Sequence, residues 1–579
     1  MTTYQPFTSV VIPVFFRELE ITCNSIVMLT PHKKVIWFAV ISRLFIILLS
    51  AALNFIIPDH KADAFRSPQD PSDKEKSLAD AFIKFLFGGL VHWDAQYFIH
   101  IARYGYTYEN CLAFFPLYPM SIRIFAGCLY YLVEGFMSLY SVIVVSSVVV
   151  NFVTFIISAS VLHRLSLQVL RNEQLAYKAA ILYCVNPASI FFVSAYSETL
   201  FACLTFYGLL KSGNGSSKNI SVGCGLPFGL GAVQRANGIV NIGFIVYEKL
   251  KCFFKFVIPD SAKKARHFDS LLLAPLLLVA PVVFLISFVG EILLSIIPFV
   301  MFQGYGYYKF CTVPEHNLPD FIVSYAETND LRLPGTASLK SLVDHKDHWC
   351  NRSLPLAYTY VQDHYWNVGF LRYYQWKQIP NFLLAMPVVC IILTHAYRFV
   401  KQHPRLCYTL GLWEDVPYTD SKVTEKLRVQ MKENKIKFAP GMFVYVVHVV
   451  FLTIFCTLCI HVQVTTRIVA SASPILYWFT AYHFFKVPAS LEDEEEERQK
   501  VSNDRNAICF ASFLCKLSTS KRKNALVEGV DSLENLQSKW KVFILTDVAP
   551  NKEAKLIKYY FLAYVVLGTA LFSNCLPWT

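Results

Sequence analysis

The sequence predicts an all-α, polytopic membrane protein with about eleven transmembrane helices, joined by lumenal interfacial helices and loops. Of the 579 residues, 55% are apolar and 16% are charged, whereas soluble domains carry roughly 25% charged residues. Several uncharged apolar runs reach the roughly 18 residues that a helix needs to cross a bilayer. Because backbone groups inside lipid must find their hydrogen bonds within the segment, these runs are expected to be helical.

The net charge of +12 would indicate nucleic-acid binding in a soluble protein. In this chain Lys and Arg lie mostly in short segments between apolar runs, as the positive-inside rule expects of cytosolic loops. We therefore expect no nucleic-acid partner. Residues 1–34 lack the order of basic, apolar and small-residue regions of a signal peptide, so we expect an uncleaved cytosolic extension.

The first expected span is Val35 to Pro58, and Lys33 and Lys34 place its start in the cytosol. Residues 59–117 then form a first lumenal loop, and residues 138–162 span back. The other expected spans are residues 179–210, 220–247, 271–302, 379–400, 441–462, 468–485 and 557–576.

Two of these spans contain polar interruptions, at Asn186-Pro187 and Glu198 in one and around Arg235 in the other. We expect each to form two short helices that meet at depth, which is tolerated where the chain lines a cavity. A buried Arg235 requires a partner, either Glu198 or an anionic ligand. The alternative is an arginine that reaches the membrane surface from a helix end.

A second expected lumenal loop covers residues 304–377. It contains Asn351-Arg-Ser, a glycosylation acceptor that supports a lumenal position. Cys311 and Cys350 both lie in this loop, so an oxidising lumen would allow a disulfide between them, although the sequence does not fix the pairing.

The expected organisation has four parts. They are a cytosolic extension (1–34), a multi-span catalytic core (35–486), a charged cytosolic loop (487–556) and a last helix with a lumenal C-terminus (557–579). The acidic block at residues 492–500 is typical of solvated chain and not of a metal site.

Polar chemistry is concentrated in residues 90–119, directly after an apolar run. His92, Trp93 and Asp94 precede an expected interfacial helix at residues 95–104. A carboxylate at the membrane face can take a proton from an attacking hydroxyl group, so Asp94 is the candidate general base, with His92 and Trp93 as its neighbours in the site. The alternative is an aromatic belt in which Asp94 only caps a helix.

Residues 360–374 mix aromatic and polar side chains, as in a sugar-binding surface; an aromatic girdle at the headgroups is the alternative. Three arginines near this face could bind an anionic group such as a phosphate: Arg235, Arg372 and Arg467. The candidate substrate-binding residues are Glu198, Arg235, Asn237, Gln362, Asp363, Trp366, Asn367, Arg372 and Arg467. There is no Asp-x-Asp metal motif, and no metal site is expected.

A series of short segments recurs in order along the chain. They are IIPDHKADAF (56–65), HWDAQYFIHIARYGYTYE (92–109), AFFPLYP (113–119), NPAS (186–189), AYSE (195–198), RANG (235–238), YVQDHYWNVGFLRYY (360–374), IPNFLLA (379–385), HVQVTTR (461–467), SPILYW (473–478) and the terminal LPWT. With these segments the chain resembles the GPI mannosyltransferase 2 (PIG-V) family over nearly its whole length. It departs from that family at the N-terminus, where about 34 residues precede the first span.

The resemblance implies a C-type glycosyltransferase in the endoplasmic-reticulum membrane that needs no cofactor. It implies transfer of the second mannose, in α-1,6 linkage, from dolichyl-phosphate mannose to the GPI-anchor precursor. A β-linked donor and an α-linked product imply a single inverting displacement with one base, Asp94. The implied partners are the two lipid substrates and membrane lipids, with room for a small membrane partner subunit.

Two other classes of protein share some of these features. A transporter or scramblase of lipid-linked sugars also has broken helices with buried charges, but the chain shows no internal repeat. A non-catalytic subunit could bind lipid-linked sugars without turning them over. Loss of function at Asp94 without loss of binding would separate that subunit from an enzyme.

Overall fold

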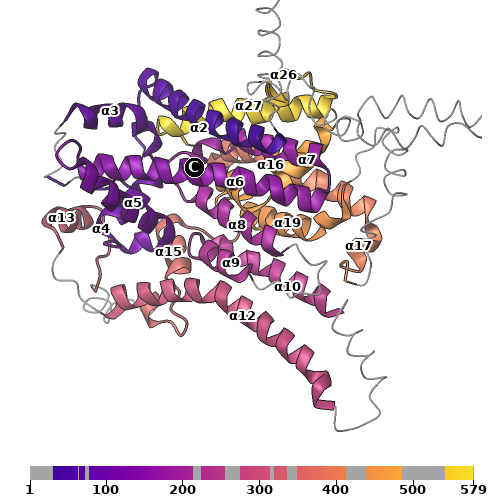
Figure 1. The fold of residues 1–579 in the computed structure, drawn as a ribbon. Helices are drawn as coiled ribbons and strands as arrows, with labels where there is room; N and C mark the ends of the chain where they lie inside the picture. The colour runs from indigo at the N-terminus through magenta and orange to yellow at the C-terminus, as the bar shows by residue number, and fades with distance from the viewer. Residues whose placement is uncertain are drawn as a thin grey trace, which may run out of the picture.

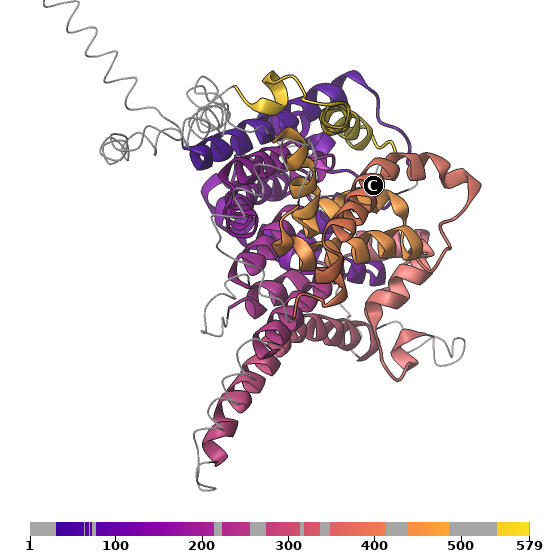
Figure 2. The ribbon, with the colours of Figure 1, turned by 90° about the vertical axis from the view of Figure 1, so that its right-hand side faces the viewer.

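The structure is a computed structural model that describes residues 30–62, 64–68, 70–71, 77–212, 223–254, 274–312, 318–335, 348–412, 438–485 and 541–577. These residues are helical or irregular, and no β-strand occurs among them. The helices form one bundle, with α12 slanting away from it in two perpendicular views (Figure 1, Figure 2). The predicted all-α class is confirmed.

Six helices are long and apolar enough to cross a membrane, counting only the described part of the chain. They are α2 (Pro31–Ile56), α6 (Leu139–Leu170), α12 (Ala274–Tyr307), α16 (Ile379–Gln402), α19 (Phe443–Cys459) and α27 (Lys552–Ser573). Eleven spans are not confirmed, because three of the expected spans are divided into helices that are too short to count as membrane spans.

Two of these divisions were predicted. The first separates α7 (Glu173–Cys184) from α8 (Glu198–Ser212), and the second separates α9 (Gly225–Ala232) from α10 (Ile242–Cys252). The third was not predicted. The expected span at residues 468–485 breaks at Ser473-Pro474, between α20 (Thr465–Ala472) and α21 (Ile475–Ala481), because a proline cannot donate the backbone hydrogen bond that would continue the helix.

A buried arginine stabilises the break after α7. Arg43 of α2 donates to the carbonyl oxygens of Cys184 at 2.7 Å and Ser189 at 3.1 Å, and its guanidinium lies 3.9 Å from the centre of the Phe155 ring. The last carbonyls of a helix lack partners within the helix and carry partial negative charge. Arg43 therefore supplies hydrogen bonds to carbonyl groups that the break leaves without helical partners.

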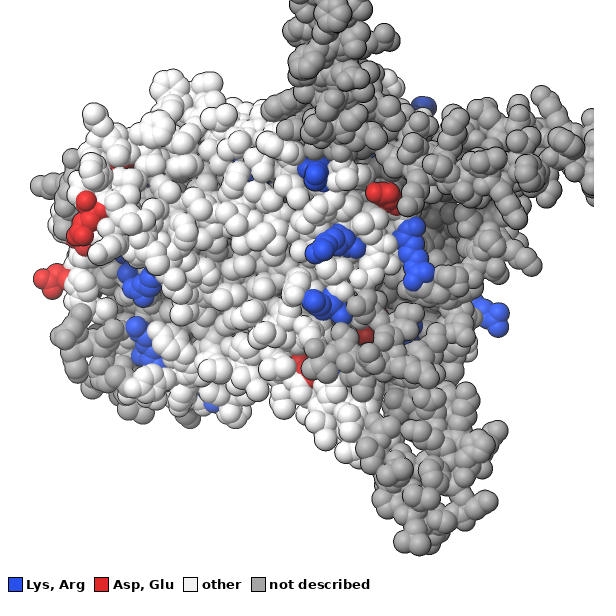
Figure 3. Space-filling model, viewed as in Figure 1, with Lys and Arg blue, Asp and Glu red and all other residues white. Residues whose placement is uncertain are grey.

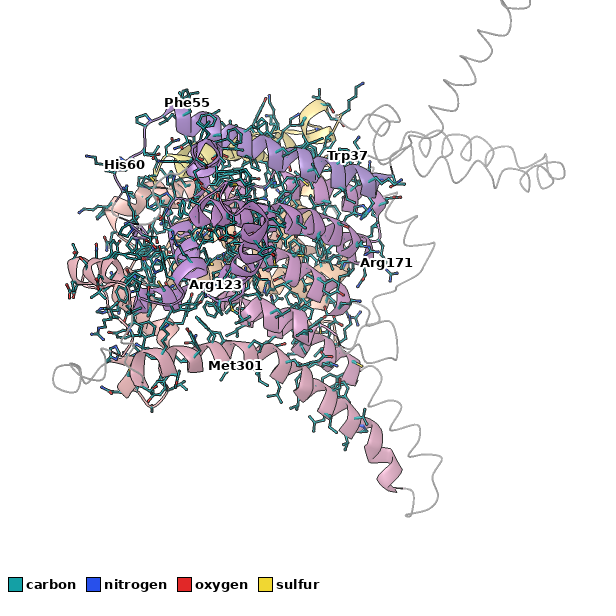
Figure 4. All side chains as sticks on the ribbon, turned by 60° about the vertical axis from the view of Figure 1, so that its left-hand side comes forward. Trp37, Phe55, His60, Arg123, Arg171 and Met301 are labelled. Carbon is teal, nitrogen blue, oxygen red and sulfur yellow. A yellow bond between two sulfur atoms is a disulfide. The ribbon has the colours of Figure 1, made fainter. Side chains whose placement is uncertain are left out.

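Other short helices lie at the two ends of the bundle. At one end, called here the α4 end, lie α3 (Leu78–Phe87), α4 (Ala95–Tyr104), α5 (Leu117–Val133), α13 (Asp320–Thr328) and α15 (Ala357–Trp366); at the other, the α17 end, lie α17 (Pro404–Tyr408) and α26 (Phe543–Thr546). Charged side chains cluster toward both ends, with an uncharged belt between them (Figure 3). Phe55 and His60 mark the α4 end, and Trp37 and Arg171 the opposite end (Figure 4).

A buried carboxylate joins the two large loops at the α4 end. Glu109 accepts hydrogen bonds from Trp349 at 2.9 Å and from the Tyr365 hydroxyl at 3.1 Å, and His348 lies 3.2 Å away. A disulfide between Cys311 and Cys350 closes the second loop beside this contact. Both loops therefore form one layer over the end of the bundle.

This contact predicts a pH-dependent stability. Burial raises the pKa of Glu109, but hydrogen bonds from His348 and Trp349 and the charge of Arg332 outweigh it and lower the pKa below its usual value. A carboxyl with a lowered folded pKa stabilises the fold above its unfolded pKa of about 4.3, and this contribution disappears as the pH falls through the folded pKa. Wild-type thermal stability in detergent should therefore decrease below about pH 4.3.

At neutral pH, Glu109→Gln should lower the free energy of unfolding by about 1–3 kcal/mol, because donors directed at a carboxylate lose their charged acceptor. The matched control is Glu327→Gln, an exposed carboxylate of α13, which should leave the melting temperature unchanged. Equal melting temperatures for Glu109→Gln and the wild type would contradict this assignment.

Candidate active site

Asp94 stands directly before α4 but does not cap it. No side-chain hydrogen bond links its carboxylate to the helix amides. Its Oδ2 instead accepts a hydrogen bond from Arg467 Nη2 at 2.9 Å, and its backbone N–H donates to the Tyr196 hydroxyl at 3.1 Å. Trp93 has a left-handed backbone (φ 57°), which a non-glycine residue keeps only where its surroundings enforce it. The interpretation of Asp94 as a helix cap is therefore wrong, because its carboxylate binds Arg467 and not the amides of α4.

Arg467 connects the two carboxylates of the site. Besides its bond to Asp94, its Nε lies 3.6 Å from Glu198 Oε1. Its guanidinium sits against the rings of Phe191 and Tyr196, at 5.4 and 5.3 Å from their centres. Nη1 is buried and has no hydrogen-bond partner among the described residues. One side of the guanidinium is therefore free to bind an anion.

Glu198 is fully buried at the start of α8, where a negative charge also suits the helix dipole. It pairs with Arg235 as well as with Arg467. Arg235 further donates to Ser197 Oγ at 3.2 Å and to Asn237 Oδ1 at 3.4 Å. Of the partners expected for Arg235, the structure supplies Glu198, and the interpretation as an arginine that reaches the membrane surface is wrong.

We call Asp94, Glu198, Arg235 and Arg467 the arginine–carboxylate cluster. It contains two positive and two negative groups, so its buried charges balance. A buried charge without a partner would be strongly destabilising, whereas a balanced and hydrogen-bonded set is tolerated.

Several buried polar atoms beside this cluster have no hydrogen-bond partner in the described part of the chain. They are Trp93 Nε1, Gln234 Oε1, Asn237 Nδ2 and Thr465 Oγ1. Each belongs to a residue within two positions of a cluster member. Unpaired buried polar atoms are rare in folded proteins, so their accumulation here marks a place where a polar ligand would fit.

His92 lies apart from the arginine–carboxylate cluster. Its Nε2 is 3.8 Å from Asp59 Oδ2, and potential ligand atoms of Asp59, His92 and Cys575 lie within 4.8 Å of one another. Burial lowers the pKa of His92, although the charge of Asp59 acts in the opposite direction. This trio could hold a metal ion by geometry, so the expectation of no metal stays a prediction.

The 360–374 segment reaches the site through one aromatic residue. The Trp366 ring lies 6.0 Å from those of Tyr97 and Phe114, next to α4, and its carbonyl accepts a hydrogen bond from His461 at 3.0 Å. His461 in turn stacks on Tyr373 at 4.6 Å.

The polar residues of this segment mostly bind one another. Arg372 pairs with Asp363 and also donates to Asn367 Oδ1 at 3.3 Å, and all three are exposed. Gln362 is partly buried, and its carbonyl accepts the Val368 N–H at 3.1 Å. Of the arginines proposed for the phosphate, the structure joins Arg235 and Arg467 through Glu198 and pairs Arg372 within its own loop.

The sequence interpretation missed three residues that shape this site. Tyr196 holds the Asp94 backbone, Ser197 holds Arg235, and His461 links the Arg467 segment to Trp366. Their positions in the sequence could have indicated them. Tyr196 and Ser197 directly precede Glu198, and His461 begins the segment that ends at Arg467. Burial lowers the pKa of His461, which favours its neutral form.

An apolar cavity of about 500 Å³ lies between α4, α5 and α12. Its lining includes Pro298, Met301, Phe302 and Val233, and Val233 is two residues from Arg235. Arg123 also lines it, and Arg123 and Met301 come from the facing helices α5 and α12 (Figure 4). The cavity is suited to a hydrocarbon chain beside the polar site.

Comparisons with known proteins agree on one family. A sequence model of the family described as mannosyltransferase (PIG-V) matches residues 32–579. GPI alpha-1,6-mannosyltransferase 2 of Cricetulus griseus is 36% identical, covering 95% of this chain and 99% of the relative. The protein of the same name from Homo sapiens is 34% identical over 95% of this chain and 99% of its own length.

GPI mannosyltransferase 2 of Drosophila melanogaster is 36% identical over 79% of this chain and 93% of its own length. Among solved structures, the Archaeoglobus fulgidus oligosaccharyltransferase AglB overlaps 90% of this chain and 59% of its own, at 11% identity and a TM-score of 0.33. That structural likeness is too distant to support an argument.

The geometry predicts different roles for the two carboxylates. Glu198→Gln removes the charge that two buried arginines share, and it should destabilise the fold by about 3–5 kcal/mol, the usual effect of breaking a buried ion pair. Asp94 is partly exposed and pairs with only one arginine, so Asp94→Asn should change stability much less. Thermal unfolding of both variants in detergent measures this difference, and equal losses of stability would contradict the assignment.

Proposed function

The chain belongs to the PIG-V family of mannosyltransferases, and we propose that it transfers the second mannose of the GPI-anchor precursor from dolichyl-phosphate mannose, in α-1,6 linkage. Its relatives make it a glycosyltransferase of GPI-anchor biosynthesis in a multi-pass membrane protein. The proposed donor, linkage and position of the added mannose go further than that. The linkage and the position of the mannose rest on the names of the relatives. The observation that carries the lipid-phosphate donor is the arginine–carboxylate cluster beside an apolar cavity.

The donor has a hydrocarbon chain, a phosphate and a sugar, and the structure offers a surface for each. The apolar cavity fits part of the chain. Arg467 presents an unpaired buried Nη1, and an arginine binds phosphate oxygens through strong, charge-assisted hydrogen bonds. Trp93 and Trp366 are aromatic surfaces against which a sugar ring could pack.

In the proposed reaction, the acceptor hydroxyl oxygen attacks the anomeric carbon of the donor mannose while Asp94 takes the hydroxyl proton. The bond between that carbon and the phosphate oxygen breaks, and its electron pair leaves with dolichyl phosphate. Attack from the opposite face converts the β-linked donor into an α-linked product. No covalent bond to the protein is formed.

Arg467 couples phosphate binding to base catalysis. Its Nη2 donates to Asp94 Oδ2. A donor phosphate that binds the unpaired Nη1 attracts the same guanidinium and draws it away from the carboxylate, so Asp94 loses its partner and turns to the acceptor hydroxyl. The charge that develops on the leaving phosphate is then stabilised by Arg467, and Arg235 stays paired with Glu198 beside it.

The orientation in the membrane follows from this chemistry. We propose a C-type glycosyltransferase in the endoplasmic-reticulum membrane, with the α4 end in the lumen and the α17 end in the cytosol. The loops at 59–117 and 304–377 then lie in the lumen, where Asn351 is exposed on the surface and open to glycosylation. Most of residues 1–34 and 487–556, assigned to the cytosol, lie outside the described residues.

Complementation tests the proposed function. Expression of the chain in cells that lack the second GPI mannosyltransferase should restore GPI-anchored proteins to the cell surface. Accumulation of precursors with a single mannose despite normal expression would refute the assignment of the second mannose.

Asp94→Asn should reduce mannose transfer about 10²- to 10⁴-fold at normal expression, the usual contribution of a general base. Asn keeps the shape and can still accept a hydrogen bond from Arg467, but it cannot take a proton. Asp320→Asn is the matched control, because Asp320 is an exposed carboxylate at the start of α13, outside the cluster and outside the candidate substrate-binding residues. Transfer by Asp94→Asn at the wild-type rate would exclude Asp94 as the base.

A further inference from the structure

Two buried histidines and a carboxylate meet at the α17 end. His395 belongs to α16, His483 to η12 (Tyr482–Phe484), and Glu553 to the first turn of α27. The Nε2 atoms of the histidines are 2.6 Å apart, and His483 Nδ1 is 3.3 Å from Glu553 Oε2. One potential ligand atom from each residue lies within 4.8 Å of the other two.

The hydrogen bonds of this group leave one nitrogen unsatisfied. His395 Nδ1 is 2.6 Å from the carbonyl oxygen of Ile391. A carbonyl only accepts, so Nδ1 carries the proton and Nε2 presents a lone pair. His483 must then donate from Nε2 toward His395, which leaves its Nδ1 lone pair facing the Glu553 carboxylate, another acceptor. A neutral His483 cannot satisfy both neighbours.

A second proton on His483 or a bound metal cation resolves this conflict, and we propose that the group is a binding site for a divalent transition-metal ion of the zinc class. Two imidazoles and a carboxylate form a known set of zinc ligands. The bond from His395 Nδ1 to a backbone carbonyl is the outer contact that metal-bound histidines usually make. Arg398 holds both Glu553 oxygens, at 2.8 and 2.9 Å, and fixes the carboxylate.

The geometry requires an adjustment of His483, which presents a different ring nitrogen to each neighbour, Nε2 to His395 and Nδ1 to Glu553. One nitrogen of His483 must therefore turn to face the ion. Two nitrogen ligands at about 2.0–2.1 Å from a tetrahedral zinc ion lie roughly 3.3 Å apart, so the histidine rings must also separate from their present contact of 2.6 Å. Glu553 is half-exposed while the histidines are buried. The ion would therefore enter from the surface at Glu553, with a water molecule as its fourth ligand.

The three ligands come from segments that are far apart in the chain. His395, His483 and Glu553 belong to α16, η12 and α27, so a bound metal would join these three elements. It also fixes the start of α27 to α16. Metal binding would stabilise the fold because the unfolded chain does not offer these ligands together.

The test uses the full-length protein, purified in detergent with an affinity tag that contains no histidine. After incubation with zinc sulfate and desalting, the wild type should retain about one zinc ion per chain, and zinc removal by EDTA should lower its melting temperature. The double variant His395→Gln/His483→Gln should lose the zinc and the response to EDTA. The control is His403→Gln, a histidine at the same end that bonds to the Phe438 carbonyl, which should behave as the wild type.

The proposal would be overturned if the wild type retained no more zinc than the double variant, whether both retained none or both retained one ion per chain. If the double variant does not fold, cobalt bound to the wild type decides. Visible absorption of a tetrahedral site with nitrogen and oxygen ligands supports the proposal. No cobalt absorption, or a thiolate charge-transfer band that disappears in Cys575→Ser, contradicts it.

Discussion

The arrangement of the α4 end depends on one largely buried guanidinium, that of Arg467, shared between Asp94 and Glu198. Burying charges is unfavourable unless they are balanced and hydrogen-bonded, and each member of the arginine–carboxylate cluster is therefore held by another. Three elements meet at these contacts: the start of α4, the start of α8, and α20. Two of the broken spans contribute to this, because Glu198 begins α8 after one break and Arg235 lies in the other, between α9 and α10.

The helix α27 is apolar along its middle and makes polar contacts at both of its ends, as the whole bundle does. Near its end, Ser573 Oγ lies 2.7 Å from Ser50 Oγ, and the Ser573 carbonyl accepts from Asn54, close to the first loop at the α4 end. At its start, Glu553 binds Arg398 at the α17 end. α27 is thus anchored by polar contacts at both ends, and a metal ion at Glu553 would fix the end farther from Asp94.

The sequence predicted the fold class and most of the long helices, because apolar length and loop charge follow from the physics of the bilayer. It also identified Asp94, Glu198, Arg235 and Arg467 as candidates, since charged residues beside or within apolar runs are exceptional. It anticipated the Arg235–Glu198 pair but not the pair of Asp94 with Arg467, which lie 373 positions apart. Periodicity along one helix carries no information about which distant helix ends will meet.

Two further features of the fold were not predicted from the sequence. The break at Ser473-Pro474 lies within an apolar run that reads as a continuous span. Arg43 was not singled out, because its partners are backbone carbonyls, which leave no mark in a sequence. The most direct test of the central claim, that donor phosphate displaces Asp94 from Arg467, is the affinity of the purified protein for dolichyl phosphate. The claim predicts tighter binding by Asp94→Asn than by the wild type, because the competing carboxylate is neutralised; equal or weaker binding would contradict it.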